Sequence, residues 1–348
     1  MVVAFYIRDF ALGGGSRAMY QLCLSMPNVK FHIFGKYGVM AADFVGLANV
    51  TLHYVNRWDC FVYAKTLKIC KSLGVDLIHF HSFIPALYSL IFGAEKAIYT
   101  FHGIHYRKYD FLHSRAIKFI RFYLMLLLVK RMQGVVVLCN DDAQYLQNLF
   151  GNNILSNKIA VIPNAMKIPT CGSGYKFPQN KINLLVVARY DYQKGLDILL
   201  DLLKRMDESS VIKRFQIYFI GDKKVKKLLK ENKSAFVEFL AETNQPYEYM
   251  KAADLLLLPS RWEGLPMVVL EALSLGTKVI AADTANVNYL ADDKNLFVYR
   301  QFDANSFVET LQRAFASKDE PVNVDLSDFS ASNVGKKTRM FYSQILGR

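Results

Sequence analysis

The chain has 348 residues, of which 52% are hydrophobic and 21% are charged. This balance is typical of a folded globular protein of about two domains and excludes a disordered or fibrous chain. Lys and Arg exceed Asp and Glu by 13, and 18 of the 43 basic residues but only 8 of the 30 acidic residues precede position 170. We therefore expect an anionic partner: nucleic acid, an acidic membrane or a phosphorylated small molecule.

The five cysteines are scattered and form no C-x-x-C pair, which favours free thiols in a reducing cytosol over a disulfide framework or a zinc site. The N-terminal apolar run is too short for a signal peptide and is typical of a buried strand. The longest apolar run of the N-terminal half, 122–129, is far below the roughly 20 residues that span a bilayer. We expect a cytoplasmic protein without a transmembrane helix.

Short apolar segments alternate with helical patterns along the whole chain, which predicts βαβ units and parallel sheets. A first series of strands is expected at 2–7, 30–34, 77–81, 96–101, 135–138 and 158–162, and a second at 182–187, 215–221, 235–240, 255–259 and 278–281.

The segment 163–174 between the two series is rich in Pro, Gly and Asn and predicts a domain boundary. The expected fold class is α/β, with two Rossmann-like, doubly wound domains at 1–168 and 175–329 facing each other across a cleft. A final helix at 330–348 either closes the second domain or packs back on the first.

A glycine-rich turn, Gly13-Gly14-Gly15-Ser16, follows the first strand and opens a helical pattern. Backbone N–H groups at the start of a helix can hold an anion, and glycine permits close approach. The turn does not match G-x-G-x-x-G, so a purely structural βα turn explains it equally well.

Three histidines, His79, His81 and His102, end strands of the first domain. An H-x-H pair on a strand places both rings on one face, where they could bind a metal. The sequence offers neither a third ligand at a suitable spacing nor a D-x-D motif, so we expect no metal site.

The segment 107–131 holds seven Lys and Arg residues and one acidic residue, interleaved with aromatic and aliphatic residues. This pattern predicts a basic amphipathic helix on an anionic membrane surface. The alternative is a core helix with a solvated basic face, because 124–129 is apolar all round. A second lysine run at 223–233 lacks interleaved aromatics and is typical of a solvated helix face, so nucleic acid is not an expected partner.

Two cations, Arg189 and Lys194, follow the first strand of the second domain. They lie at the carboxyl end of the strand, where open α/β sheets bind ligands. A guanidinium fork and an ammonium together suit a diphosphate, and a pair of solvated loop cations is the alternative.

The most informative stretch is Pro259 to Leu273, where a buried strand is followed by a turn at Glu263-Gly264 and by a helix that carries Glu271. Pro266 suits the first turn of this helix. One carboxylate lies in the loop and a second lies two turns into the helix, so the two can contact different parts of the same ligand. The neighbours of Glu271 are apolar, so its carboxylate is expected to be buried and to need partners.

These motifs, in this order, resemble the retaining GT-B glycosyltransferases of family 4, the glycosyl transferases group 1. The resemblance lies in E-x7-E after a P-S-x-x-E-G-x-P turn and in V-A-R-x-x-x-x-K-G-x-x-x-L-L upstream. It extends over nearly the whole chain through Gly14-Gly15, His79-Phe80-His81, Thr100 to Gly103, Val161 to Ala165, Phe219 to Asp222 and Phe239-Leu240.

For the donor, the resemblance implies that Arg189 and Lys194 hold the diphosphate and that Glu271 holds the ribose. Glu263 would hold the transferred sugar together with backbone amides. These amides are those of Gly264, Leu265, Met267 and Val268.

For the other domain, the resemblance implies that Gly14 and Gly15 approach the phosphates and the acceptor and that His102 lies over the sugar near the reaction centre. Arg17 stands where many members have an acidic residue and makes the acceptor pocket more basic. Asn164 belongs to the substrate-binding set, and the residue after it, Ala165, replaces the usual glycine.

The activity implied is retaining transfer of a hexose or N-acetylhexosamine from a nucleotide sugar, with UDP favoured, to a lipid-diphosphate-linked or oligosaccharide acceptor. This chemistry serves bacterial O-antigen, capsule or exopolysaccharide synthesis at the inner face of the cytoplasmic membrane and is expected to need no metal or other cofactor. Three alternatives stay open: a sugar-nucleotide epimerase of similar fold, a glycogen-type phosphorylase, and a basic membrane- or nucleic-acid-binding protein without catalysis.

Overall fold

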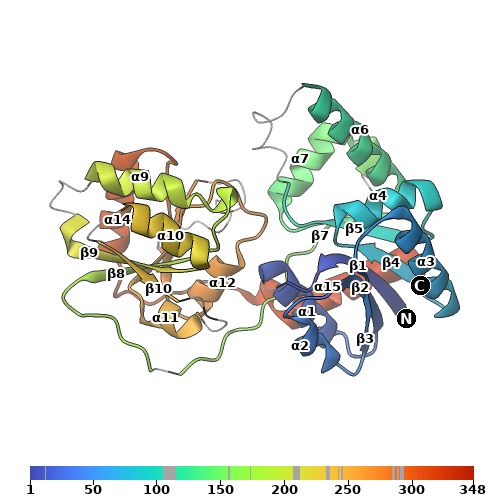
Figure 1. Ribbon diagram of the computed structural model, residues 1–348, viewed down its shortest axis with the longest axis horizontal. Coiled ribbons are helices and arrows are strands. Elements are labelled where there is room, and N and C mark those ends of the chain that lie inside the picture. Colours follow the sequence, from blue (N-terminus) through green and yellow to red (C-terminus); the bar gives the residue numbers. More distant parts are fainter. Residues whose placement is uncertain are drawn as a thin grey trace. The chain divides into compact units, whose positions relative to one another are not determined.

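The computed structural model describes residues 1–11, 13–104, 115–155, 157–172, 174–206, 212–232, 236–241, 243, 246–283, 287, 290 and 294–348. They form two compact units, each described here by itself (Figure 1). Unit 1 comprises Met1–Lys167 together with Ser327–Arg348, and unit 2 comprises Ile168–Leu326. The chain therefore leaves unit 1 once, builds unit 2, and returns.

Unit 1 is built on a seven-stranded parallel sheet in the order β3-β2-β1-β4-β5-β6-β7. The central strands are buried along most of their length, as expected for apolar runs covered on both faces. The strands are β1 (Val2–Asp9), β2 (Lys30–Lys36), β3 (Val50–Tyr54), β4 (Leu77–Phe80), β5 (Ala97–Phe101), β6 (Gly134–Val137) and β7 (Ile159–Val161).

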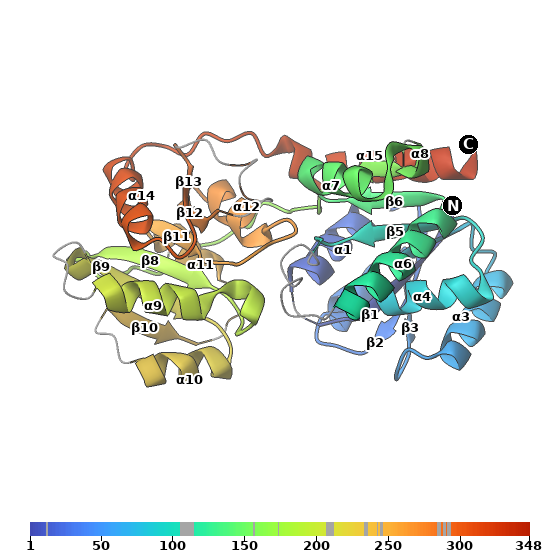
Figure 2. The same cartoon turned by 90° about the horizontal axis from the view of Figure 1, so that it is seen from above.

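Helices cover both faces of this sheet (Figure 2). One face packs against α1 (Gly14–Ser25), α2 (Ala41–Val45) and α15 (Ala331–Leu346). The other packs against α3 (Cys60–Ser72), α4 (Phe83–Phe92), α6 (Arg115–Arg131) and α7 (Asn140–Phe150), and the short α8 (Asn152–Leu155) follows α7.

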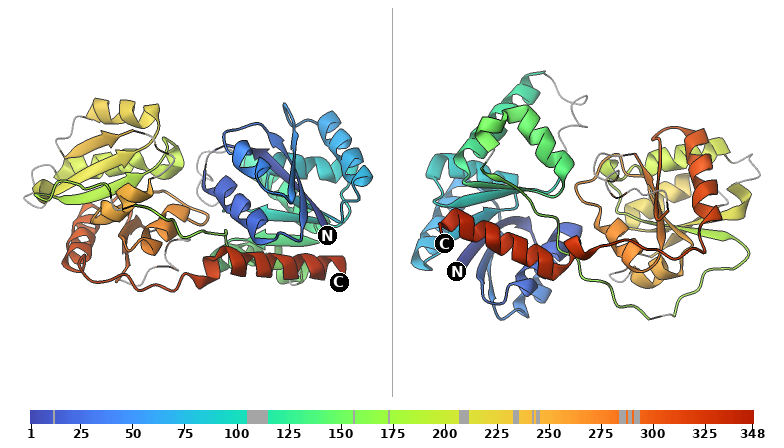
Figure 3. Two further views of the ribbon diagram at one scale, coloured as in Figure 1. Left: turned by 90° about the horizontal axis from the view of Figure 1, so that it is seen from below. Right: turned by 180° about the vertical axis from the view of Figure 1, so that it is seen from behind.

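The C-terminal helix α15 is part of unit 1 and lies beside α1 (Figure 3). Ser330 caps its first turn by accepting a hydrogen bond from the Asn333 amide at 3.3 Å. The phenol of Tyr342 is buried and lies 2.6 Å from Nδ1 of His79 on β4. The sheet and its last helix are thus joined by a polar contact within an apolar core.

Unit 2 carries a six-stranded parallel sheet in the order β10-β9-β8-β11-β12-β13. Its strands are β8 (Ile182–Val187), β9 (Phe215–Ile220), β10 (Val237–Leu240), β11 (Leu255–Leu258), β12 (Lys278–Ala282) and β13 (Leu296–Tyr299). One face packs against α9 (Leu196–Met206), α10 (Lys223–Asn232) and α14 (Ala304–Ala316), and the other against α11 (Tyr247–Ala252) and α12 (Met267–Ser274).

The expected α/β class with two doubly wound sheets is confirmed, and every strand expected from the sequence is present within three residues of its predicted bounds. The sequence analysis missed two strands, β3 and β13. Both are short strands at the edges of their sheets, where one side of the strand has no partner and the apolar run is brief.

Two other findings bear on the sequence-based expectations. No helix among the described residues is long and apolar enough to cross a membrane. All five cysteines carry free thiols.

Candidate active site

The carboxyl edge of the unit 2 sheet is shaped by a close approach between two loops. Gly195 has a φ of 62°, and a Cβ at this position would collide with the Pro259 carbonyl oxygen. Glycine therefore lets the 3₁₀ turn Tyr192–Lys194, which follows β8, close on the loop after β11. Asp191 caps this turn by accepting a hydrogen bond from the Gln193 amide at 3.0 Å.

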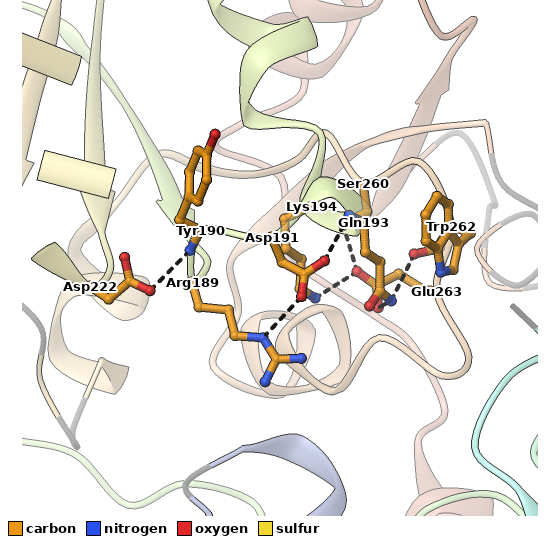
Figure 4. Close-up of polar contacts among 9 residues, drawn as sticks. All are labelled: Arg189, Tyr190, Asp191, Gln193, Lys194, Asp222, Ser260, Trp262 and Glu263. Atoms are coloured by element: carbon orange, nitrogen blue, oxygen red, sulfur yellow. Dashed lines mark hydrogen bonds and ion pairs between the residues drawn. The ribbon is translucent and has the colours of Figure 1, made fainter. Parts of the chain in front are cut away.

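Glu263 lies at the centre of a buried polar cluster in this loop pair (Figure 4). Its Oε1 lies 2.8 Å from Nζ of Lys194 and accepts a hydrogen bond from the Ser260 hydroxyl at 2.6 Å. Its Oε2 accepts a hydrogen bond from Nε2 of Gln193 at 3.3 Å. The side chains of Lys194 and Glu263 are only 20% and 7% exposed, so the pair is held in one arrangement that a ligand can meet without reorganisation.

Arg261 fixes the loop beneath this cluster, and sequence reasoning did not single it out. Its guanidinium makes a bidentate pair with Asp197 at 2.8 and 2.6 Å, and it stacks over the Tyr192 ring at 3.8 Å. Burial alone would raise the pKa of Asp197, but the hydrogen bonds and charge of Arg261 lower it below its ordinary value. The pair ties the start of α9 to the loop after β11.

Arg189 lies on the same edge but is not part of the Glu263 cluster. Its side chain is 59% exposed, and its Nε lies 3.9 Å from Asp191 (Figure 4). The next backbone amide, that of Tyr190, donates to Asp222 at 3.3 Å. The structure therefore holds Lys194 rigidly and presents Arg189 to solvent.

Glu271 is buried in α12, as the apolar pattern around it predicts, and its Oε1 accepts a hydrogen bond from Tyr247 at 3.4 Å. Pro266 is the cap of α12 rather than a residue of its first turn. The first hydrogen bonds of this helix run from the amides of Val269 and Leu270 to the Pro266 carbonyl. The amides predicted to hold the sugar are those of Gly264, Leu265, Met267 and Val268. They therefore lie before the first hydrogen-bonded turn, in the loop and at the start of α12.

In unit 1, the glycine turn opens α1 as predicted, with Gly13 as the cap and Gly14 and Gly15 as the first two helical residues. Among the described residues, no heavy atom lies within 4 Å of a Cβ built at Gly13 or Gly15. Packing therefore does not explain glycine at these two positions. Arg17 lies in the same first turn, which holds no acidic residue, so a cation stands at the positive end of the helix dipole.

The three histidines lie at the ends of two adjacent strands, with His79 on β4, His81 just after β4 and His102 just after β5, and the ring centroids of His79 and His81 are 4.1 Å apart. Nδ1 of His81 is 2.9 Å from Nε2 of His102, and Nε2 of His79 is 2.6 Å from the Thr100 hydroxyl. Burial and the neighbouring His102 ring lower the pKa of His79 to about 3. Burial and the two neighbouring rings also lower the pKa of His81 well below its ordinary value. Both rings are thus neutral near pH 7.

A small pocket brings His102 together with Asn164 and with the inner face of α1. Ala165 also lines this pocket, as do Thr338 and Val334 of α15. The described residues contain no group of three His, Cys, Asp or Glu side chains that could hold a metal ion.

The predicted site residues therefore fall into two sets. In unit 2, Lys194 and Glu263 are in direct contact, Arg189 lies in the loop after β8 and Glu271 lies in α12. Unit 1 places Gly14, Gly15 and Arg17 at the start of α1, with His102 and Asn164 in the pocket beside it.

The basic segment predicted at 107–131 corresponds in part to α6, Arg115–Arg131. Residues 107–114 lie outside the described residues, as does Lys233 of the second lysine run. Leu128 and Val129 are buried against the sheet, whereas Leu127 is exposed, so 124–129 is not covered on all sides. The exposed apolar side chains of α6 are Ile117, Phe119, Ile120, Tyr123 and Leu127.

Comparison with known proteins identifies two domains in the chain. Residues 13–168 match the model of glycosyltransferase family 4, and residues 173–326 match that of glycosyl transferases group 1. A UDP-Gal:α-D-GlcNAc-diphosphoundecaprenol α-1,3-galactosyltransferase of Escherichia coli is 24% identical over 72% of this chain and 69% of its own. A capsular polysaccharide biosynthesis glycosyltransferase of Staphylococcus aureus is 23% identical over 88% and 85%.

Among solved structures, a glycosyltransferase of Rickettsia africae superposes with a TM-score of 0.75 at 17% identity, covering 99% of this chain and 98% of its own. The two units therefore have the arrangement of elements found in that enzyme.

Proposed function

Because this chain is a glycosyltransferase with the GT-B fold, we propose that it transfers a hexose or N-acetylhexosamine from UDP to a lipid-diphosphate-linked glycan, with retention at the anomeric carbon. The expectations of this fold and of transferase activity are confirmed. The epimerase, phosphorylase and non-catalytic alternatives are set aside, because both halves of the chain match glycosyltransferase domains. The role proposed is in bacterial surface polysaccharide synthesis, as the name of the capsular polysaccharide enzyme of S. aureus gives for that relative.

The observation that carries the donor site is the buried Lys194–Glu263 pair at the carboxyl edge of the unit 2 sheet. Glu263 accepts hydrogen bonds from the sugar hydroxyls, and Lys194 with Arg189 neutralises the diphosphate. Tyr247 holds Glu271 in place for the ribose. The amides at the start of α12 lie where the helix dipole favours an anion.

In the reaction, the bond between the anomeric carbon and the phosphate oxygen breaks, and UDP leaves with the bonding electrons. The acceptor oxygen bonds to the anomeric carbon on the same face and loses its proton to the departing phosphate. Negative charge builds on the diphosphate, so pre-placed cations supply the dominant stabilisation. This scheme requires no metal ion, and we propose that transfer proceeds in excess EDTA.

On unit 1, we propose that Arg17 and the α1 amides meet the acceptor phosphate and that His102 lies over the transferred sugar. The positive charge of Arg17 and the positive end of the α1 dipole both attract an anion, which favours a phosphate-bearing acceptor. We further propose that the exposed apolar side chains and the cations of α6 dock on an anionic membrane surface, and that this surface is the cytoplasmic face of the membrane, where the lipid-linked acceptor would be found.

The test is a thermal-shift screen against UDP, GDP and ADP, followed by transfer assays with the sugars of the nucleotide that binds. At about 100 times its dissociation constant, a ligand stabilises the folded state by about 2.7 kcal/mol. We expect a shift with UDP in the wild type and a smaller shift in the Lys194→Ala variant. Glu231→Gln on α10 is the matched control and should behave as the wild type. A shift with GDP or ADP alone would refute the UDP assignment.

A further inference from the structure

Two exposed tyrosines stand side by side at the carboxyl edge of the unit 1 sheet. Tyr37 is 75% exposed and Tyr54 is 51% exposed, and their ring centroids are 5.5 Å apart with the planes at 62°. Tyr54 is the last residue of β3, and its strand partner is Gly35, two residues before Tyr37. Large aromatic side chains that stay in solvent at this edge are candidates for ligand contact, because open α/β sheets bind ligands at the carboxyl ends of their strands.

The loop that carries Tyr37 is firmly anchored, so the exposure of this ring is built into the fold. The Phe10 amide donates to the Lys36 carbonyl and the Met40 amide donates to the Phe10 carbonyl, both at 3.0 Å. Gly38 lies against the Phe10 backbone, and a Cβ at this position would collide with the Phe10 carbonyl. The loop is thus held to the end of β1 while the Tyr37 side chain stays exposed.

The Tyr54 ring is likewise held in place by packing against a buried side chain. This ring meets the buried Phe10 ring edge-on, with centroids 6.1 Å apart, and Phe10 in turn meets Phe44 of α2 at 5.5 Å. The Val55 amide donates to the Gly35 carbonyl at 3.0 Å and fixes the exit of β3. The two rings therefore form a rigid surface, here called the tyrosine platform, that needs no ordering when a ligand binds.

Three cations lie at or just after the carboxyl ends of β1, β2 and β3, the strands at this edge of the sheet. Lys36 ends β2 and is exposed, and Arg8 near the end of β1 is 70% exposed. Arg57 follows β3 by three residues and is also exposed. Arg8 and Arg57 each use Nε on a neighbouring acid, Asp9 at 2.7 Å and Asp59 at 2.6 Å, which orients both guanidinium groups.

We propose that the tyrosine platform is a binding subsite for a pyranose ring of the acceptor glycan, with Arg8, Lys36 and Arg57 near its phosphate. The electron-rich face of an aromatic ring attracts the C–H groups on the apolar face of a sugar, and guanidinium groups recognise phosphate. This subsite rests on the proposed function, since it gives the acceptor a defined place on unit 1. It also adds a determinant of acceptor choice that lies on a different unit from the donor residues.

The experiment is saturation-transfer NMR on the full chain with three probes: the α-1-phosphates of glucose, galactose and N-acetylglucosamine. Excess UDP is added so that the probes cannot report on the donor site. Aromatic protons are saturated, and transfer to the sugar ring protons is measured in the wild type, in a Tyr37→Ala/Tyr54→Ala variant, in Tyr37→Phe, and in Val45→Ala as a control at an exposed position of α2.

We expect transfer from at least one probe in the wild type, a loss of at least fivefold in the double alanine variant, and retention in Tyr37→Phe and Val45→Ala. Arg8→Ala/Arg57→Ala should weaken the phosphorylated probe but not the corresponding free sugar. Absence of transfer, or transfer unchanged in the double alanine variant, would overturn the proposal. The UDP thermal shift of the same samples reports separately on the donor site, so failure of one assignment is distinguishable from failure of the other.

Discussion

At the scale of single residues, Glu263 differs from the exposed carboxylates of the chain because three side chains of different kinds contact it. Lys194, Ser260 and Gln193 satisfy both carboxylate oxygens. Removing the charge leaves the partly buried Lys194 without its anion and breaks the arrangement that the donor sugar would meet.

We therefore expect Glu263→Gln to lower kcat about 10²–10³-fold, the range typical of one lost electrostatic contact in a buried site. The measurement is release of UDP under saturating donor. Glu231→Gln, on the exposed side of α10, should keep the wild-type rate. An unchanged rate in Glu263→Gln would show that the site assignment on unit 2 is wrong.

His81 is expected to act through His102 rather than on the substrate. Its Nδ1 lies 2.9 Å from Nε2 of His102 and fixes the orientation of that ring. His81→Ala should lower kcat about tenfold while the donor KM changes little, and His81→Asn, which keeps a hydrogen-bonding side chain, should recover part of the loss. Equal losses in both variants, accompanied by a lower Tm, would instead indicate a structural role.

The residues of the candidate site differ in how far the sequence reveals them. Glu263, Glu271 and Lys194 stand in motifs with fixed spacing, so they can be found without a structure. Arg261 cannot, because its partner Asp197 lies 64 positions away in the sequence. The tyrosine platform is hidden for the same reason, since Tyr37 and Tyr54 meet only through the pairing of β2 and β3.

At the scale of elements, the buried strands were predictable, as were the edge strands β7 and β10, whereas the edge strands β3 and β13 were not. The continuous apolar runs of β8 and β11 have no plausible place other than a sheet covered on both faces. Strand β3 is only partly buried along its length, and its five residues, Val-Thr-Leu-His-Tyr, contain no continuous apolar run. Its identification depends on its pairing with β2, which the sequence alone does not show.

The burial of His79 in the core of unit 1 makes the stability of this unit sensitive to acid. His79 is neutral in the folded state because its pKa is about 3 there, whereas an unfolded histidine titrates near 6.5. The unfolded chain therefore binds an extra proton between these values, and stability falls as the pH drops from 6.5 towards 3, by about 1.4 kcal/mol per pH unit for one such group.

This acid sensitivity is checked by measuring Tm between pH 7 and pH 4. His79→Gln should show a flatter decline than the wild type, even though it is less stable at pH 7 through loss of the Tyr342 contact. His53→Gln, at a partly buried edge-strand position, should keep most of the wild-type slope. Parallel curves for the wild type and His79→Gln would contradict the assignment.

The surface of α6 gives an element-scale prediction for membrane binding. Phe119, Tyr123 and Leu127 recur every four residues and are all exposed, so they lie on one side of the helix. Changing all three to Ser should reduce co-sedimentation with phosphatidylglycerol vesicles at least tenfold. Met340→Ser, an exposed apolar position on α15, is the control. Retained binding in the triple variant would remove α6 from the membrane surface.

At the scale of the whole molecule, unit 2 is inserted between the main part of unit 1 and its last helix. Val334, Phe341 and Tyr342 of α15 are buried against the sheet and α1. A chain that ends at residue 326 should therefore keep a folded unit 2, lose the cooperative melting of unit 1 and expose apolar surface that binds a hydrophobic dye. Cooperative melting of both units without α15 would show that the helix is dispensable.

The same insertion sets an order of events during synthesis. Residues 1–167 leave the ribosome first, yet α15 cannot pack on their sheet until all of 168–326 has been made. At 5–20 residues per second, synthesis of this segment takes roughly 8–30 s. Throughout that interval the α15-facing side of the sheet is an apolar surface open to chaperones or to other nascent chains. The rate at which ribosomes traverse unit 2 is thus a determinant of how much of this enzyme reaches its folded state.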